Sequence, residues 1–133
     1  MKYFAYGSNL LPSRLLARTP GAVVVGNAWL AGYALRWNKR GKDGTGKCNV
    51  VPAAGGRVPG AVYEIPAEQM ADLDLIEGGY ERVLVKLEGG AEAWTYVALP
   101  NYVDEAAVPA ADYFALVRDG RAWHGLPALT YAA

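Results

Sequence analysis

The sequence has few of the side chains that form disulfides or metal sites. It contains one cysteine, Cys48, and one histidine, His124, among 133 residues. A single cysteine excludes an internal disulfide, and one cysteine with one histidine is too small a set for a structural zinc site. We therefore expect neither a disulfide framework nor a bound metal, and the sequence implies no cofactor.

Net charge and long apolar runs are also missing. Lys+Arg and Asp+Glu each number 13, so the formal net charge is zero. This balance gives no electrostatic basis for binding nucleic acid or an anionic membrane. No run approaches the roughly 20 apolar residues of a membrane span, and the first residues lack the apolar segment of a signal peptide. We expect one cytoplasmic domain, residues 1–133.

Serine is scarce as well, with only Ser8 and Ser13 in the chain. A serine hydrolase needs a nucleophile and a neighbouring base, and neither serine lies in a Gly-x-Ser-x-Gly turn. His124 belongs to residues 123–131, which we expect to be irregular, with this histidine at the surface. A serine hydrolase is therefore the weaker functional alternative.

What the chain does contain is many short apolar segments separated by glycine and proline. This pattern predicts an α+β domain, and the short strands favour closure into a small mixed β-barrel with flanking short helices. Helices are expected where apolar residues recur at helical spacing. The predicted helices are residues 12–17, 66–77 and 111–117, with Gly120 ending the last; the predicted strands are 21–30, 33–37, 48–52, 58–65, 82–87 and 93–99.

Residues 3–10 predict a strand, a small-residue turn and then a helix. Tyr3 and Phe4 favour a strand, Gly7-Ser8-Asn9 suits a tight turn, and Pro12 suits a first helical turn, with Leu11, Leu15 and Leu16 expected to face inward. Such a turn can present several backbone N–H groups to one point, where a helix N-terminus adds positive potential. The stretch predicts an anion-binding cradle or oxyanion hole; a plain connection between strand and helix is the alternative.

Glu77 is the carboxylate that we single out as a general acid and base. It lies at the predicted end of the helix 66–77, before Gly78-Gly79, and shares a helix face with Met70 and Leu73. Both the negative end of the helix dipole and an apolar surrounding favour the protonated acid. A carboxyl group in such a place suits proton transfer near neutral pH. The alternative is an exposed glutamate at a helix end.

Residues 41–47 match the first seven positions of a phosphate-binding P-loop. The eighth position, however, holds Cys48 where the motif needs Ser or Thr for magnesium. Residues 49–52 look extended, and Pro52 would break the helix that a P-loop requires. We expect a solvated hairpin loop, whose Lys39, Arg40, Lys42 and Lys47 would favour a substrate part that carries a carboxylate.

Two motifs resemble those of the γ-glutamylcyclotransferase family. Residues 3–10, Tyr-Phe-Ala-Tyr-Gly-Ser-Asn-Leu, resemble the family's opening signature. Residues 73–78 resemble its second motif, an acidic helix end that carries the catalytic glutamate. Weaker similarity covers residues 32–38, 49–52 and 58–63, and the tail resembles the γ-glutamyl amino acid branch in Asn101, Tyr102, Pro109, Tyr113, residues 125–127 and Tyr131.

The resemblance implies a small mixed β-barrel and the conversion of a γ-glutamyl amide to 5-oxoproline with release of the amine. The substrate's own α-amine is the nucleophile, so no metal or cofactor is implied. Glu77 would carry both protons, and the backbone N–H groups of Gly7, Ser8, Asn9 and Leu10 would bind oxygens. Four tyrosines are expected at the substrate pocket: Tyr6, Tyr80, Tyr102 and Tyr113.

Some points stay open. A non-catalytic module that binds γ-glutamyl or other small metabolites on the same fold is the rival from another class. The leaving amine can be an amino acid, the ε-amine of lysine or another metabolite, although the tail argues against glutathione. The family includes dimers, which leaves a homodimer open.

Overall fold

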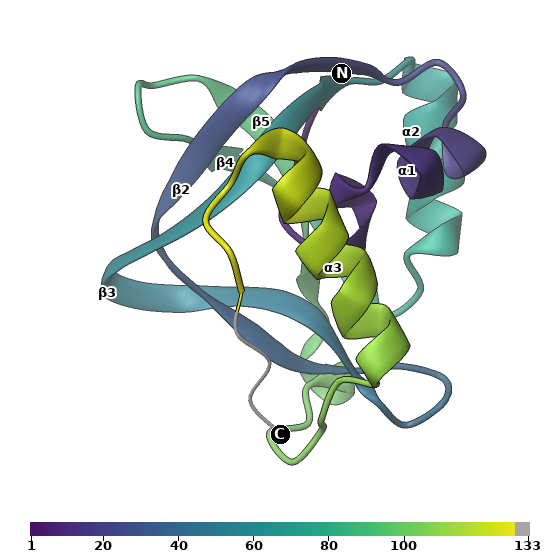
Figure 1. Cartoon of the computed structure of the whole chain (residues 1–133), viewed down its shortest axis with the longest axis vertical. Helices are drawn as coiled ribbons and strands as arrows, with labels where there is room; N and C mark the ends of the chain where they lie inside the picture. The colour runs from purple at the N-terminus through teal and green to yellow at the C-terminus, as the bar shows by residue number, and fades with distance from the viewer. Residues whose placement is uncertain (130–133) are drawn as a thin grey trace.

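The computed structural model describes residues 1–129 and is built around one five-stranded sheet of order β2-β3-β1-β5-β4. The central strand is β1 (Lys2–Ala5), which pairs antiparallel with β3 (Gly46–Glu64) and parallel with β5 (Glu92–Ala98). The outer strands are β2 (Val23–Arg40) and β4 (Tyr80–Lys86). The helices α1 (Pro12–Arg18), α2 (Ala67–Ile76) and α3 (Ala111–His124) pack around this sheet (Figure 1). This architecture confirms the α+β prediction.

Strands β2 and β3 are longer than the sequence predicts. Each combines two predicted strands, because the glycines that look like turns are accommodated as bends within the ladder. The pairing register of β2 on β3 shifts between Val24 and Gly26 and again between Ala31 and Tyr33. Gly32 lies at the second shift with φ +82, a conformation that glycine adopts without steric cost. The result is one long curved hairpin, which forms much of the molecule's outline in Figure 1.

The word barrel describes this sheet only loosely. β2 and β4 are the two edges, and in residues 1–129 no ladder joins them. The Glu88 N–H, in the turn after β4, donates to the Trp29 carbonyl oxygen of β2 at 2.9 Å. The hairpin thus curves toward the far edge without closing the hydrogen-bonded ring that a true barrel needs.

Helix α2 follows its prediction closely, whereas α3 continues past the predicted end at Gly120 to His124. Gly125 ends α3 with φ +68, in the left-handed region. Trp123 and His124 are therefore helical, so the prediction of an irregular tail from residue 123 is wrong at its start. The predicted tail position Tyr131 lies outside the described residues. None of the helices in residues 1–129 is long and apolar enough to span a membrane.

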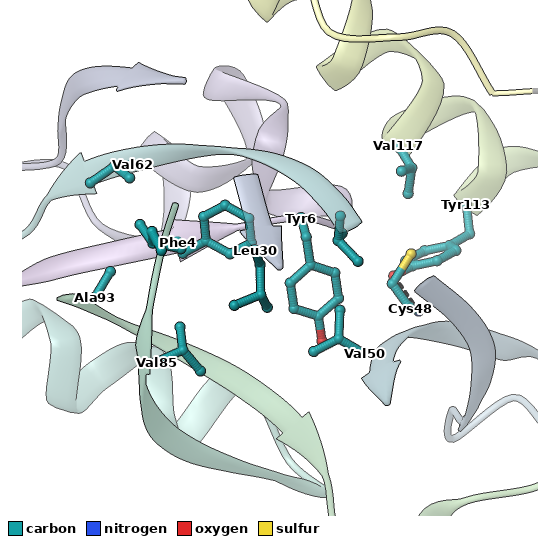
Figure 2. Close-up of a cluster of buried hydrophobic side chains, with 12 residues drawn as sticks. Phe4, Tyr6, Leu30, Cys48, Val50, Val62, Val85, Ala93, Tyr113 and Val117 are labelled. Carbon is teal, nitrogen blue, oxygen red and sulfur yellow. Dashed lines mark hydrogen bonds between the residues drawn. The ribbon is translucent and has the colours of Figure 1, made fainter. Parts of the chain in front are cut away.

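Two apolar clusters lie on opposite faces of β1, because successive side chains of a strand alternate. Phe4 and Tyr6 point into the cluster that Val117 and Tyr113 of α3 also enter (Figure 2). Tyr3 and Ala5 belong to the other cluster, together with Met70 and Leu73 of α2 and with Leu10 and Leu15. Leu15 is inward as predicted, but Leu16 is 41% exposed. The segment after β1 therefore lies among three helices.

Candidate active site

The turn after β1 is a short 3-10 helix, η1 (Ser8–Leu10), that begins after Gly7. The Leu10 N–H donates to the Gly7 carbonyl oxygen at 3.0 Å. Within residues 1–129 the backbone N–H groups of Gly7, Ser8 and Asn9 have no hydrogen-bond partner. Three of the four predicted donors are thus available, while the Leu10 donor is consumed inside the turn.

Helix α3 holds η1 in place from the other end of the chain. A Cβ atom added to Gly120 would lie 2.6 Å from Leu10 Cβ, so glycine is what permits this close approach. His124 Nε2 lies 2.7 Å from the Leu10 carbonyl oxygen and 3.0 Å from the Tyr63 hydroxyl. Burial lowers the pKa of His124. The expectation of a surface histidine is wrong: its ring secures the end of the turn.

Glu77 caps the C-terminal end of α2, its N–H donating to the Leu73 carbonyl oxygen at 2.9 Å. Its side chain is only 15% exposed. Oε1 accepts hydrogen bonds from Asn9 Nδ2 at 2.9 Å and from Arg18 NH1 at 3.1 Å. The carboxylate therefore lies against η1, which brings the two predicted motifs into direct contact.

Arg18 and the Asn9 side chain are the parts of this arrangement that the sequence argument missed. Arg18 NH1 also donates to Asn9 Oδ1 at 3.2 Å, and Asn9 Nδ2 lies 3.0 Å from the Tyr3 hydroxyl. The Glu77 carboxylate therefore accepts one hydrogen bond from a guanidinium and one from an amide. The sequence did contain a signal for a cation here, because Arg14 and Arg18 share one face of α1 at i and i+4.

Glu77 and η1 border a small, open pocket with a cavity volume of about 30 Å³. Of the predicted site residues, the pocket brings together Glu77, Gly7, Ser8, Asn9, Tyr6, Tyr80 and Tyr113. Three more lining residues were not predicted: Tyr3, Cys48 and Tyr96. Leu10 and Tyr102 do not line it; Leu10 is fully buried, and Tyr102 lies in the 3-10 helix η2 (Pro100–Tyr102) beyond Tyr80.

The tyrosine hydroxyls are fixed in the pocket wall by the backbone. Tyr6 donates to the Tyr96 carbonyl oxygen, and Tyr80 donates to the Cys48 carbonyl oxygen at 2.7 Å. Tyr113 accepts from the Cys48 N–H at 3.1 Å, an interaction drawn in Figure 2. Burial raises the pKa of all three phenols, so they stay neutral. The pocket therefore has rigid, uncharged aromatic walls.

Cys48 lines the same pocket but is poorly suited to act as a nucleophile. Burial raises the pKa of its thiol to about 12, so the reactive thiolate is scarce near neutral pH. No group of three or more His, Cys, Asp or Glu residues that could hold a metal occurs among residues 1–129. Glu77 is the acidic side chain of the pocket.

A comparison with family models matches residues 3–115 to the family described as gamma-glutamyl cyclotransferase, AIG2-like. The chain belongs to this family. The matched range includes both η1 and Glu77, so it confirms the resemblance seen in the sequence. As a γ-glutamylcyclotransferase family member, the chain combines the family's opening motif with the acidic end of α2 in one pocket.

Curated relatives and solved structures agree with this membership. The gamma-glutamylcyclotransferases of Homo sapiens and Bos taurus are 31% and 30% identical to the chain, each over 94% of it and 72% of the relative. A solved structure named gamma-glutamyl cyclotransferase has a TM-score of 0.84 at 28% identity and covers 95% of this chain and 80% of that one. The fold of the family is therefore the fold of this chain.

The P-loop-like stretch of this family member is a β-hairpin turn between β2 and β3, as expected. Its Gly41 N–H donates to the Thr45 carbonyl oxygen at 2.9 Å, and Lys47 pairs with Asp43 at 3.5 Å. Cys48 continues into β3 and not into a helix. The geometry therefore does not provide the helix that a P-loop needs.

Proposed function

We propose that this chain is a γ-glutamylcyclotransferase that converts a γ-glutamyl amino acid or amine to 5-oxoproline and the free amine, with Glu77 as its acid and base. One observation carries the proposal: Glu77 borders the same pocket as Gly7, Ser8 and Asn9, whose backbone N–H groups have no partner within residues 1–129. A proton acceptor and a set of oxyanion donors are the two elements that this cyclisation requires from the protein.

In this mechanism the substrate folds so that its α-nitrogen faces its own δ-carbonyl carbon. Glu77 takes a proton from the α-ammonium, which frees the lone pair for attack. A carbon–nitrogen bond forms, the carbonyl oxygen becomes an oxyanion, and the original amide bond then breaks. Over the reaction the α-nitrogen gives up two protons and the leaving nitrogen gains two, so Glu77 ends ionised as it began.

The oxyanion is assigned to η1. Backbone N–H groups of Gly7, Ser8 and Asn9 are fixed by the fold, so they need no reorganisation when charge develops on the oxygen. Asn9 has a second role, because its side-chain amide donates to the Glu77 carboxylate at 2.9 Å. Losing one such donor typically costs about 100- to 1,000-fold in turnover.

Arg18 is assigned the role of keeping Glu77 ionised before the substrate binds. Its guanidinium lies 3.1 Å from Oε1 and is itself mostly buried. The proton acceptor must be a carboxylate at the start of the reaction, and an adjacent cation favours that state. The α-ammonium of the substrate then brings the proton that the carboxylate takes.

Four further expectations accompany the proposal. The partner is a small molecule and not nucleic acid, in keeping with the zero net charge. One domain over residues 1–133, a cytoplasmic location and a homodimer stay predictions.

The test is 5-oxoproline release from γ-glutamyl-alanine and from its N-acetyl derivative. We expect 5-oxoproline and alanine in equal amounts from the first substrate and no reaction from the second, because acetylation removes the nucleophile. Alanine released from the acetylated substrate would mean that water or a protein group attacks, and the proposal would fail. Saturable binding of γ-glutamyl-alanine without turnover would favour the non-catalytic module.

A further inference from the structure

Lys39, near the end of β2, has a side chain that is largely buried and, among residues 1–129, no anion paired with its charge. Its residue is only 7% exposed. Within residues 1–129 its ammonium makes no ion pair and no hydrogen bond to a side chain or carbonyl. A charge with so little exposed surface loses part of its hydration, so a lysine in this position without an anion calls for an explanation.

Two tyrosine rings enclose this ammonium. Nζ lies 4.8 Å from the ring centroid of Tyr80 and 5.3 Å from that of Tyr102, both within cation–π range. Gly79 packs against both the Lys39 stem and the Tyr102 ring, because a Cβ added there would lie 2.8 Å from Lys39 Cε and 2.7 Å from Tyr102 Cδ1. Such contacts replace part of the lost hydration without supplying a negative charge.

Backbone pairing after β5 holds the Tyr102 ring close to the Lys39 ammonium. The segment after β5 pairs with β2 through a bridge between Lys39 and Val103, and the Asp104 N–H donates to the Asn38 carbonyl oxygen at 2.7 Å. Asn38 Nδ2 also donates to Glu105 at 3.0 Å. These bonds fix the position of η2, so the enclosure of Lys39 is built into the structure.

Lys39 lies next to the pocket, against one of its tyrosine walls. Tyr80, one of its two rings, lines the pocket, while Lys39 itself does not. Among residues 1–129, the buried side-chain polar atom that has neither a hydrogen-bond partner nor contact with solvent is Arg121 Nε. The Lys39 ammonium also lacks a hydrogen-bond partner within these residues but is not among such atoms, so solvent can reach it. Burial lowers the pKa of Lys39, while the negative charge of Glu77 acts in the opposite direction and raises it. Glu77 cannot neutralise it, because its carboxylate is paired with Arg18.

A neighbouring lysine shows the contrast. Lys47 Nζ lies 4.5 Å from the ring centroid of Tyr113, another pocket tyrosine. Its charge, however, is paired with Asp43 at 3.5 Å. Of the two lysines that stand over pocket tyrosines, Lys39 is therefore the one whose charge is left for a ligand.

We propose that Lys39 is a specificity-determining residue that binds a carboxylate on the leaving amine, so that the pocket selects γ-glutamyl-α-amino acids over neutral γ-glutamylamines. This inference rests on the proposed function. The glutamyl half is placed inside the pocket, with its nitrogen at Glu77 and its carbonyl oxygen at η1. The group attached to the δ-carbonyl is the part that extends out of the pocket, past Tyr80 toward the Lys39 ammonium.

The experiment compares γ-glutamyl-alanine with γ-glutamyl-alaninamide, which has the same shape but no negative charge on the leaving group. For wild type we expect kcat/KM to be roughly 10- to 100-fold higher for the alanine substrate, the range given by a hydrogen bond to a charged group. In Lys39→Met the alanine substrate should lose this advantage, while the alaninamide rate changes by less than about threefold. Lys39→Gln is the second variant, should methionine impair folding.

The control is Lys86→Met, which removes a lysine charge from the exposed end of β4, outside the pocket lining, and should leave the preference intact. Equal loss on both substrates would assign Lys39 to the glutamyl half or to folding, and would overturn the proposal. An unchanged preference in Lys39→Met, or no preference in wild type, would overturn it too. Absence of 5-oxoproline from both substrates would instead refute the proposed function, and the Lys39 assignment with it.

Discussion

Replacing Glu77 by glutamine separates catalysis from folding in this protein. Glutamine has nearly the same shape, and its carbonyl oxygen can still accept from Asn9 Nδ2, which lies 2.9 Å from Oε1. The change removes the negative charge that pairs with Arg18, whose side chain is 21% exposed. A pair of this exposure lies between surface and buried ion pairs, so we expect the free energy of unfolding to fall by about 1–2 kcal/mol.

The effect on turnover should be far larger than the effect on stability. Glutamine cannot accept the α-ammonium proton, and loss of general acid–base catalysis costs about 100- to 10,000-fold. The assay is the initial rate of 5-oxoproline release from γ-glutamyl-alanine, with the melting temperature and binding of the same substrate measured on the same sample. A folded variant with binding close to wild type but almost no turnover is the expected result.

The matched control is Glu68→Gln, the same chemical change in the first turn of the same helix α2. Glu68 is exposed and does not line the pocket, so its rate and stability should stay close to wild type. A Glu77→Gln enzyme that keeps more than a tenth of wild-type turnover would refute the assignment of Glu77 as acid and base. The proton acceptor would then have to be sought elsewhere in the pocket.

Three other substitutions test η1 and its support. Gly7→Val should reduce turnover at least about tenfold even in folded protein, because an added Cβ would already lie 3.0 Å from Cys48 Cβ and the turn must shift. Ser8→Ala should be much milder, since the donors are backbone groups; a loss as large as that of Glu77→Gln would reinstate a direct role for Ser8. Gly120→Val should lower the free energy of unfolding by about 1–3 kcal/mol in chemical denaturation, because its Cβ would lie 2.7 Å from the Leu11 nitrogen. Unchanged stability in that variant would refute the close packing of α3 on η1.

The local parts of the site could be predicted from the sequence. A glycine-containing turn after an apolar strand and a helix with Met70, Leu73 and Glu77 on one face are patterns set by neighbouring residues. The structure has both, with Met70 and Leu73 fully buried and Glu77 at the helix cap. Periodicity is enough here because the strand and helix repeats fix which side chains share a face.

Predictions based on glycine were wrong where the role of the glycine depends on packing against residues far away in the sequence. Gly120 reads as a helix end, yet it lies inside α3 because Leu10 needs the space that a side chain would fill. Gly32 reads as a break between two strands, yet the ladder of β2 on β3 continues past it through a register shift. A single sequence does not distinguish a glycine that ends an element from one that lets another segment approach.

The contacts that complete the site were decided by the tertiary structure. Arg18 and Glu77 are 59 residues apart, and His124 and Leu10 are 114 apart. They meet because β1 lies in the middle of the sheet, so the turn after it is reached by α2 from one face and by α3 from the other. Residue types and local spacing identify the acid and the turn, but only the order of strands and the packing of helices determines which charges surround them.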